Sequence, residues 1–271
     1  MIRLLKKQSL TLNKLLIILF LLNCASVQAK EDFGAKSILI EDRKSGKVIF
    51  KKNEKEIYPI ASLTKLVTAV TASRIFENND LIQIKKSHLP KNSLESKADL
   101  KAGKEYSFTE ILHGLLIPSG NDAARGIEDA MLKRGKSFAE ETADFLKKEN
   151  LSSTSIFEAV GLNSENRSNA EDLSRIADIT FGNPLLSEIM TKSEYRIKDT
   201  KGSTHLIRNR LKLNSYRDWT IYGKTGRTKK AGQCFAGIIE KNTKKYKIIF
   251  LGSENAEAEI KSAADFLERR E

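Results

Sequence analysis

The order in which hydrophobic patterns follow one another constrains the fold of this chain more than any other feature. β-Rich runs at residues 36–42 and 47–51 flank a short polar turn, which predicts a hairpin. Apolar residues at helical spacing begin at 63–70 and continue through the middle of the chain. Two further hairpins are predicted at 194–207 and 234–251, and a helix follows. This order predicts an α+β fold, with an antiparallel sheet flanked by helices and a helical insertion subdomain.

Helix starts in the middle region are marked by serines that precede a glutamate by three residues. This spacing is typical of a capping box, in which the serine side chain binds the backbone of the first turn. Three such pairs are present: Ser107 with Glu110, Ser137 with Glu140, and Ser168 with Glu171. Pro118 is predicted to end the first of these helices, and Gly182-Asn183-Pro184 the third.

The first 29 residues have the composition of a secretory signal peptide. Four basic residues and no acidic one precede an apolar run at 15–22, and small residues follow up to Ala29. The apolar run is too short for a membrane span, which needs roughly 20 residues. We therefore predict cleavage near Ala29, export to the periplasm or another extracytoplasmic compartment, and one domain over residues 30–271. Cleavage would leave Cys234 as the only cysteine, so no internal disulfide is expected, and its apolar surroundings predict a buried side chain.

The formal net charge of +12 leaves several classes of partner open. A basic surface suits nucleic acid, an anionic wall polymer or a membrane surface. Export argues against nucleic acid, and the lysines are scattered without interleaved aromatic residues, so no nucleic-acid partner is predicted. The three histidines, His88, His113 and His205, lack the spacing of zinc ligands, and neither a metal nor another cofactor is expected.

Ser62-Leu63-Thr64-Lys65 is the first of three short motifs that indicate chemistry. Residues three apart share one face of a helix, so the Ser62 hydroxyl and the Lys65 amine can meet. A serine becomes a nucleophile when a base takes its proton, and a lysine with a lowered pKa can be that base. The chain contains no second Ser-x-x-Lys, although a solvent-facing pair on an amphipathic helix would give the same pattern.

The second motif is Ser119-Gly120-Asn121. Ser-x-Asn also occurs at Ser164 and Ser253, which we interpret as a polar turn and as a loop after the last strand. Ser119 is preferred because it follows the helix-ending Pro118 and precedes another helix, a place where a hydroxyl and an amide can face a cleft.

The third motif is Lys224-Thr225-Gly226. Gly223-Lys224-Thr225 also looks like the end of a phosphate-binding loop, but that motif needs a glycine where this chain has Asp218. We predict instead a strand edge where Lys224 supplies charge, Thr225 a hydroxyl, and Gly226 room for a substrate backbone.

Taken together and in this order, the three motifs resemble the signature of penicillin-binding proteins and class A β-lactamases. Residues 58–66, 114–124 and 224–228 are similar to the D-alanyl-D-alanine carboxypeptidase family, the low-molecular-mass penicillin-binding proteins. The similarity runs from about residue 35 onward. It implies a penicillin-binding-protein or serine β-lactamase-like fold, and we expect neither a C-terminal β domain nor a C-terminal membrane anchor.

The resemblance implies a role for each motif residue. Ser62 would be the acylated nucleophile and Lys65 its general base. Ser119 and Lys224 would relay protons, and Asn121 would orient the peptide. The substrate-binding residues would be Thr225 and Gly226, Arg227 (whose N–H joins that of Ser62 in an oxyanion hole), and Arg208 at the carboxylate, with Arg210 a near-equal candidate.

The implied activity is a serine D-Ala-D-Ala carboxypeptidase that acts on peptidoglycan pentapeptides and is acylated by β-lactam antibiotics. Three alternatives remain: a DD-endopeptidase on wall cross-links, a class A-like β-lactamase, and a non-catalytic wall- or drug-binding module. Glu158 and Asn163 loosely match the deacylating site of a β-lactamase, but their spacing is off. The module is disfavoured because Ser62, Lys65 and Lys224 are all present.

Overall fold

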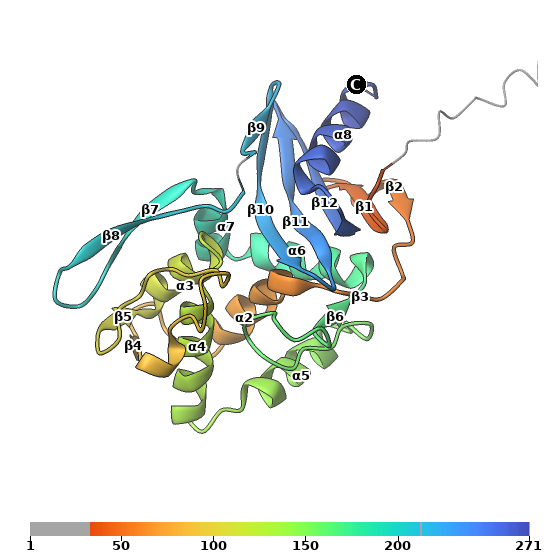
Figure 1. Ribbon diagram of the computed structural model, residues 1–271. Coiled ribbons are helices and arrows are strands. Elements are labelled where there is room, and N and C mark those ends of the chain that lie inside the picture. Colours follow the sequence, from red (N-terminus) through yellow and green to blue (C-terminus); the bar gives the residue numbers. More distant parts are fainter. Residues whose placement is uncertain (1–32, 212, 271) are drawn as a thin grey trace, which may run out of the picture. The chain divides into compact units, whose positions relative to one another are not determined.

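A six-stranded antiparallel sheet joins the two ends of the described chain (Figure 1). The computed structural model describes residues 33–211 and 213–270, so the predicted signal peptide lies outside the described residues. The strand order is β2-β1-β12-β11-β10-β9. The strands are β1 (Ser37–Asp42), β2 (Val48–Lys52), β9 (Ser215–Tyr216), β10 (Trp219–Thr228), β11 (Gly232–Lys241) and β12 (Lys244–Ser253). The predicted hairpins β1–β2 and β11–β12 are confirmed.

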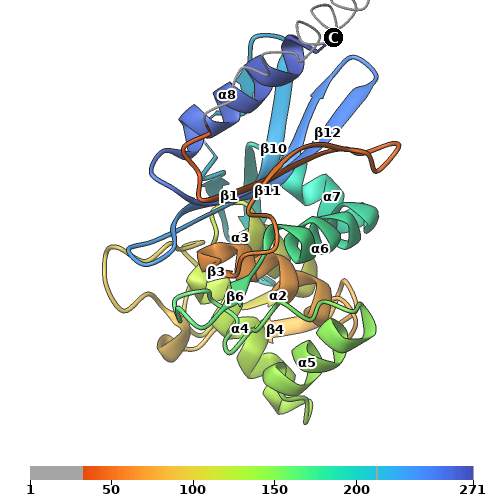
Figure 2. The same cartoon turned by 90° about the vertical axis from the view of Figure 1, so that its right-hand side faces the viewer.

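Helices cover both faces of this sheet (Figure 2). Along β1, Ile38 and Ile40 pack with the last helix, whereas Leu39 between them packs with the helical middle of the chain. This alternation follows from the two-residue period of a strand, and it explains why the central strands are apolar on both faces. The helices are α2 (Thr64–Ala72), α3 (Phe108–Leu116), α4 (Asn121–Lys133), α5 (Phe138–Lys148), α6 (Ala170–Gly182), α7 (Pro184–Thr191) and α8 (Ala256–Glu268).

Two of the three predicted helix caps are confirmed on the serine side. Ser107 and Ser137 accept hydrogen bonds from the backbone N–H groups three residues later. Glu110 does not complete its box, because its carboxylate accepts from the Tyr195 hydroxyl and the Lys198 N–H. No helix of the described residues is long and apolar enough to cross a bilayer.

The third cap was predicted one residue too early. Asn169, not Ser168, caps α6, and its side chain accepts from the Asp172 N–H. Ser168 belongs instead to a two-stranded ladder in which Tyr58 pairs with Ser168. This ladder consists of β3 (Tyr58–Pro59) and β6 (Arg167–Ser168), and it holds the segment before Ser62 against the segment before α6.

Two more two-stranded ladders complete the fold. They are β4 (Leu81–Gln83) with β5 (Glu105–Ser107), and the predicted hairpin β7 (Glu194–Lys198) with β8 (Thr204–Arg208). The β7–β8 hairpin forms an arm beside α3 and α7 (Figure 1). The loop expected at Ser253 is wrong, because Ser253 is the last residue of β12 and its hydroxyl donates to Glu259.

Candidate active site

Ser62 lies in a tight 3₁₀ turn, Ala61–Leu63, that leads directly into α2. Ala61 has a left-handed backbone with φ of +48°, which is a strained conformation for a residue other than glycine. Two glycines hold the turn from outside: a Cβ on Gly161 would lie 2.2 Å from the Ala61 carbonyl oxygen, and one on Gly226 would lie 3.0 Å from the Ser62 nitrogen. Any side chain at Gly161 would therefore displace the turn that presents Ser62.

Lys65 is fully buried and its amine is surrounded by oxygen atoms. Its Nζ lies 3.2 Å from Ser62 Oγ, 2.9 Å from Asn121 Oδ1 and 2.6 Å from the Val160 carbonyl oxygen. Burial lowers the pKa of Lys65 to about 7, although the charges of Glu158 and Asp122 oppose the shift. The amine is therefore neutral in a large fraction of molecules near neutral pH, as a general base must be.

Ser119 and Asn121 are placed by a turn between α3 and α4. Ser119 has a left-handed φ of +62°, and the Gly120 N–H closes the turn onto the Gly114 carbonyl at 2.9 Å. Asn121 is the first residue of α4, and its side-chain oxygen faces Lys65. Both side chains are almost completely buried.

Lys224 lies within β10, between its partner β11 and the Ser62 turn. Among the described residues, β9 pairs with β10 only at Trp219 and Thr220, so the rest of that edge has no strand beside it, as predicted. Lys224 Nζ donates to Ser119 Oγ and to the Thr225 carbonyl, both at 2.8 Å. Burial and the nearby charges of Lys65 and Arg210 hold the pKa of Lys224 well below its ordinary value. The three motifs thus form one continuous cluster.

A cleft of about 1140 Å³ opens beside this cluster. Ser62, Ser119, Thr225, Gly226 and Arg227 all line it. The cleft extends past the end of β10 to the start of α8.

The two candidate arginines, Arg208 and Arg210, lie in different places. Arg208 is not brought to the site: its side chain is 72% exposed and pairs with Glu194 at 3.5 Å on the β7–β8 arm. Arg210 lines the cleft instead. The chain leaves the arm at Asn209, and the Arg210 N–H then binds the Ile117 carbonyl at 3.3 Å, two residues before Ser119. This backbone contact, which local sequence does not indicate, is why the arginine at 210 reaches the motifs.

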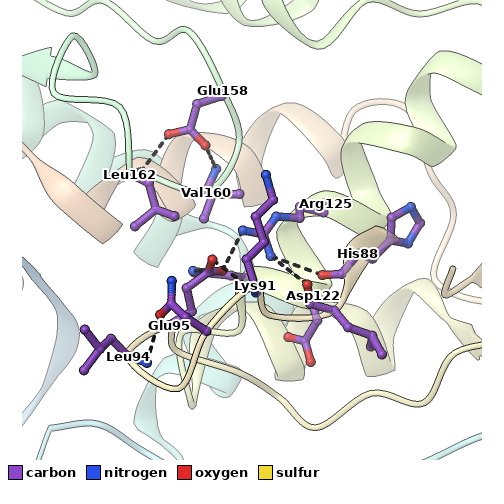
Figure 3. A network of polar contacts seen from close by, with 12 residues as sticks. His88, Lys91, Leu94, Glu95, Asp122, Arg125, Glu158, Val160 and Leu162 are labelled. Carbon is purple, nitrogen blue, oxygen red and sulfur yellow. Dashed lines mark hydrogen bonds and ion pairs between the residues drawn. The ribbon is translucent and has the colours of Figure 1, made fainter. Parts of the chain in front are cut away.

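Glu158 does not point a free carboxylate at the nucleophile. Its two oxygens accept from the backbone N–H groups of Val160 and Leu162 (Figure 3). They also accept from those of Gly161 and Asn163. The Asn166 side chain donates to the same carboxylate at 3.0 Å. Glu158 therefore shapes the loop whose Val160 carbonyl accepts a hydrogen bond from Lys65.

Glu95 is a further residue beside the motif cluster, and nothing in the local sequence predicts its position. Its carboxylate accepts from the side chains of Asn121 and Arg125 (Figure 3). An isolated glutamate in a polar stretch has no local signal for such a contact, since the partners come from α4.

The histidines and the cysteine have structural surroundings. His88 accepts from the Lys85 N–H, His113 stacks on Tyr195, and a ring nitrogen of His205 lies 2.7 Å from the Ala98 carbonyl oxygen. Cys234 is fully buried, as predicted, and burial raises the pKa of its thiol to about 11. Within the described ranges, no group of three or more His, Cys, Asp or Glu side chains is arranged to hold a metal ion.

Comparison with known families agrees with this geometry. A family model described as D-alanyl-D-alanine carboxypeptidase matches residues 24–255. The chain belongs to the D-alanyl-D-alanine carboxypeptidase family. It is accordingly a serine-type peptidase, and the resemblance inferred from the motifs is confirmed.

Relatives within this carboxypeptidase family carry two kinds of name. D-alanyl-D-alanine carboxypeptidase DacF of Bacillus subtilis is 27% identical, over 94% of this chain and 70% of the relative. A D-alanyl-D-alanine endopeptidase of Pseudomonas aeruginosa is 28% identical, over 78% of this chain and 68% of the relative.

Solved structures show the same fold. A D-alanyl-D-alanine carboxypeptidase from Mycobacterium tuberculosis superposes with a TM-score of 0.76 at 23% identity, covering 86% of this chain and 90% of that one. A Streptomyces DD-transpeptidase gives 0.78 at 22% identity, covering 88% and 97%. The penicillin-binding-protein fold predicted from the motifs is confirmed.

Proposed function

We propose that this enzyme removes the terminal D-alanine from peptidoglycan pentapeptides through an acyl-enzyme on Ser62. The observation that carries the proposal is the buried Lys65 amine, whose pKa is about 7 and which lies 3.2 Å from Ser62 Oγ. Neutral Lys65 takes the hydroxyl proton as Ser62 Oγ attacks the carbonyl carbon of the penultimate D-alanine. The N–H groups of Ser62 and Arg227 stabilise the oxyanion that develops on that carbonyl.

Collapse of the tetrahedral intermediate breaks the bond to the terminal D-alanine. The proton that Lys65 accepted passes through the Ser119 hydroxyl to the leaving nitrogen, which returns Lys65 to its neutral form. Lys224 Nζ donates to the same hydroxyl at 2.8 Å and holds it in place. Water then hydrolyses the Ser62 ester, and Lys65 serves as base for the water. Arg210 and Thr225, which both line the cleft, bind the terminal carboxylate of the substrate. Arg210 thus replaces Arg208 as the arginine proposed to bind the carboxylate, because the Arg208 side chain lies on the β7–β8 arm.

A DD-endopeptidase is the second candidate, since the Pseudomonas relative carries that name and the cleft continues well beyond Arg227. The β-lactamase alternative is disfavoured by Glu158, whose carboxylate is occupied by backbone N–H groups and is not available to activate a deacylating water. We therefore expect β-lactams to acylate Ser62 and to remain bound, because they mimic the D-alanyl-D-alanine end.

The test of substrate is a comparison of a free pentapeptide with a cross-linked muropeptide dimer. We expect release of free D-alanine from the pentapeptide at a higher kcat/KM than cleavage of the dimer, measured by liquid chromatography and mass spectrometry. Faster cleavage of the dimer would assign the endopeptidase activity instead. Turnover of neither substrate by folded protein would contradict the proposal.

The acylation rate should depend on pH in one direction at the acid side. Because only neutral Lys65 accepts the Ser62 proton, kcat/KM should rise with pH through about 7, the pKa of Lys65, and fall tenfold per pH unit well below it. The neutral, active form is the one present above the pKa, and because burial lowers this pKa, the limb lies near pH 7 and not near the ordinary lysine value. A profile of penicillin acylation from pH 5 to 9 measures this limb. An acylation rate that does not change between pH 5 and 9 would show that Lys65 is not the base.

Export remains part of the proposal. The predicted signal peptide of residues 1–29 would deliver the enzyme to the periplasm or another extracytoplasmic space, where peptidoglycan lies. The described residues from 33 onward form one compact unit, which supports assigning 30–271 to a single catalytic domain.

A further inference from the structure

Glu95 lies in the loop before β5, between two residues that line the cleft. Leu94 and Ser96 both line it, whereas the Glu95 side chain is only 7% exposed and turns inward (Figure 3). Its Oε2 accepts from Asn121 Nδ2 at 3.0 Å and from Arg125 at 2.6 Å. Its Oε1 accepts from the Lys91 N–H at 3.3 Å.

The carboxylate is held in its charged form. Burial alone would raise the pKa of Glu95, but hydrogen bonds from Asn121 and Arg125 outweigh this effect and keep the pKa below its usual value. Arg125 is itself fixed, since its other terminal nitrogen donates to the His88 and Leu89 carbonyls at 3.2 and 3.3 Å. An ionised carboxylate accepts hydrogen bonds and donates none.

This property fixes the orientation of the Asn121 amide. An asparagine side chain has an NH₂ end and an oxygen end, and exchanging them reverses both contacts. Glu95 accepts only the NH₂ end, so the oxygen end must face Lys65, where it lies 2.9 Å from Nζ. Glu95 makes no hydrogen bond to Ser62 or Lys65 among those of the described residues, so its hydrogen-bonded link to the Lys65 amine runs through Asn121. Its negative charge also favours protonated Lys65, against the larger effect of burial.

We propose that Glu95 is a positioning residue that locks the Asn121 amide with its oxygen toward Lys65. This inference rests on the proposed function, because it assigns a role in the acylation of Ser62. Asn121 and Arg125 donate to the same Glu95 oxygen, so a glutamine could keep its amide oxygen there, whereas Glu95→Leu removes the acceptor altogether. In Glu95→Leu nothing holds the NH₂ end of Asn121, and the amide is free to turn that end to Lys65, which removes an acceptor that holds the amine beside Ser62.

Four full-length proteins test the proposal: wild type, Glu95→Leu, Asn121→Asp, and the double variant. The measured quantity is the rate of acylation by a fluorescent penicillin from pH 5 to 9, together with the melting temperature. We expect Glu95→Leu to slow acylation relative to wild type about tenfold, the effect of one lost charge-assisted hydrogen bond. In the Asn121→Asp background the same change should raise the rate, because it removes one of two facing carboxylates.

A matched control comes from the same loop. Asp99 is half exposed and pairs with Lys97 at 2.8 Å, so Asp99→Asn removes a charge without touching Asn121 and should leave the rate unchanged. If Glu95→Leu does not fold, Glu95→Asp takes its place, since it keeps the negative charge but withdraws the carboxylate from Asn121 by one methylene.

Two results would overturn the positioning role: an unchanged rate for the folded position-95 variant, or the same loss in both backgrounds. Failure of the proposed function looks different, because wild-type protein would then take up no penicillin at all.

Discussion

Ser62→Ala protein is expected to keep its unmodified mass after brief exposure to penicillin, whereas wild type gains the mass of one drug molecule. The methyl group of alanine has no atom that can form the ester, so no acyl-enzyme accumulates. Peptidase activity should fall by about 10⁶-fold, the loss seen when a serine nucleophile is removed from a comparable catalytic unit. Intact-mass spectrometry measures the adduct, and D-alanine release measures the activity.

A serine at the other end of the same helix provides the matched control. Ser73 follows α2, and its buried hydroxyl has no hydrogen-bond partner among the described residues. Ser73→Ala should therefore leave the melting temperature and the adduct unchanged. An adduct on Ser62→Ala protein would place the nucleophile elsewhere. No adduct on folded wild type would show that the protein has no penicillin-reactive serine.

Lys65→Met should slow acylation of Ser62 by about 10³-fold, within the range that a general base contributes. Methionine fills much of the same buried volume but has no lone pair that can take the hydroxyl proton near neutral pH. The acid limb near pH 7 should vanish from the remaining rate, because the group that titrates there is gone. Stopped-flow fluorescence with a reporter penicillin measures both changes.

Lys247→Met separates loss of the base from loss of any buried lysine. Lys247 is 7% exposed, lies in β12, and forms ion pairs with Glu41 at 3.2 Å and with Asp178. Removing it leaves these carboxylates unpaired and should lower the melting temperature. The folded fraction should still acylate at the wild-type rate. Equal slowing by both variants would mean that Lys65 acts through stability alone.

The site could be predicted from the three motifs because the residues within each motif are neighbours in the sequence. Ser62 and Lys65 share a helix face by spacing alone, and Lys224 faces them because β10 runs beside the Ser62 turn. Period-two patterns likewise sufficed for β1–β2 and β11–β12. In these places a few neighbouring residues determine the local geometry.

The predictions that were wrong or missing concern residues whose positions depend on contacts between distant segments. Ser168 has every local mark of a cap, yet its backbone is drawn into the ladder with Tyr58, and the helix begins after Asn169. Arg208 and Arg210 are indistinguishable by local sequence, and the hydrogen bond to Ile117 decides between them. Glu95 was missed because its role depends on two partners in α4. No single segment contains the information for these contacts.

The strand order has a consequence for how the molecule comes into being. β1 joins the sheet through β12, where Ser37 pairs with Leu251, and β10 joins the rest through β11. A nascent chain that has reached only β10 therefore holds both Ser62 and Lys224 but lacks β11 and β12, the strands that join β1–β2 to β9–β10. Pairing across such a sequence separation is slow, because a long loop must close before any contact forms. The active site around Ser62 is thus assembled late, and an incomplete chain has no catalytic activity.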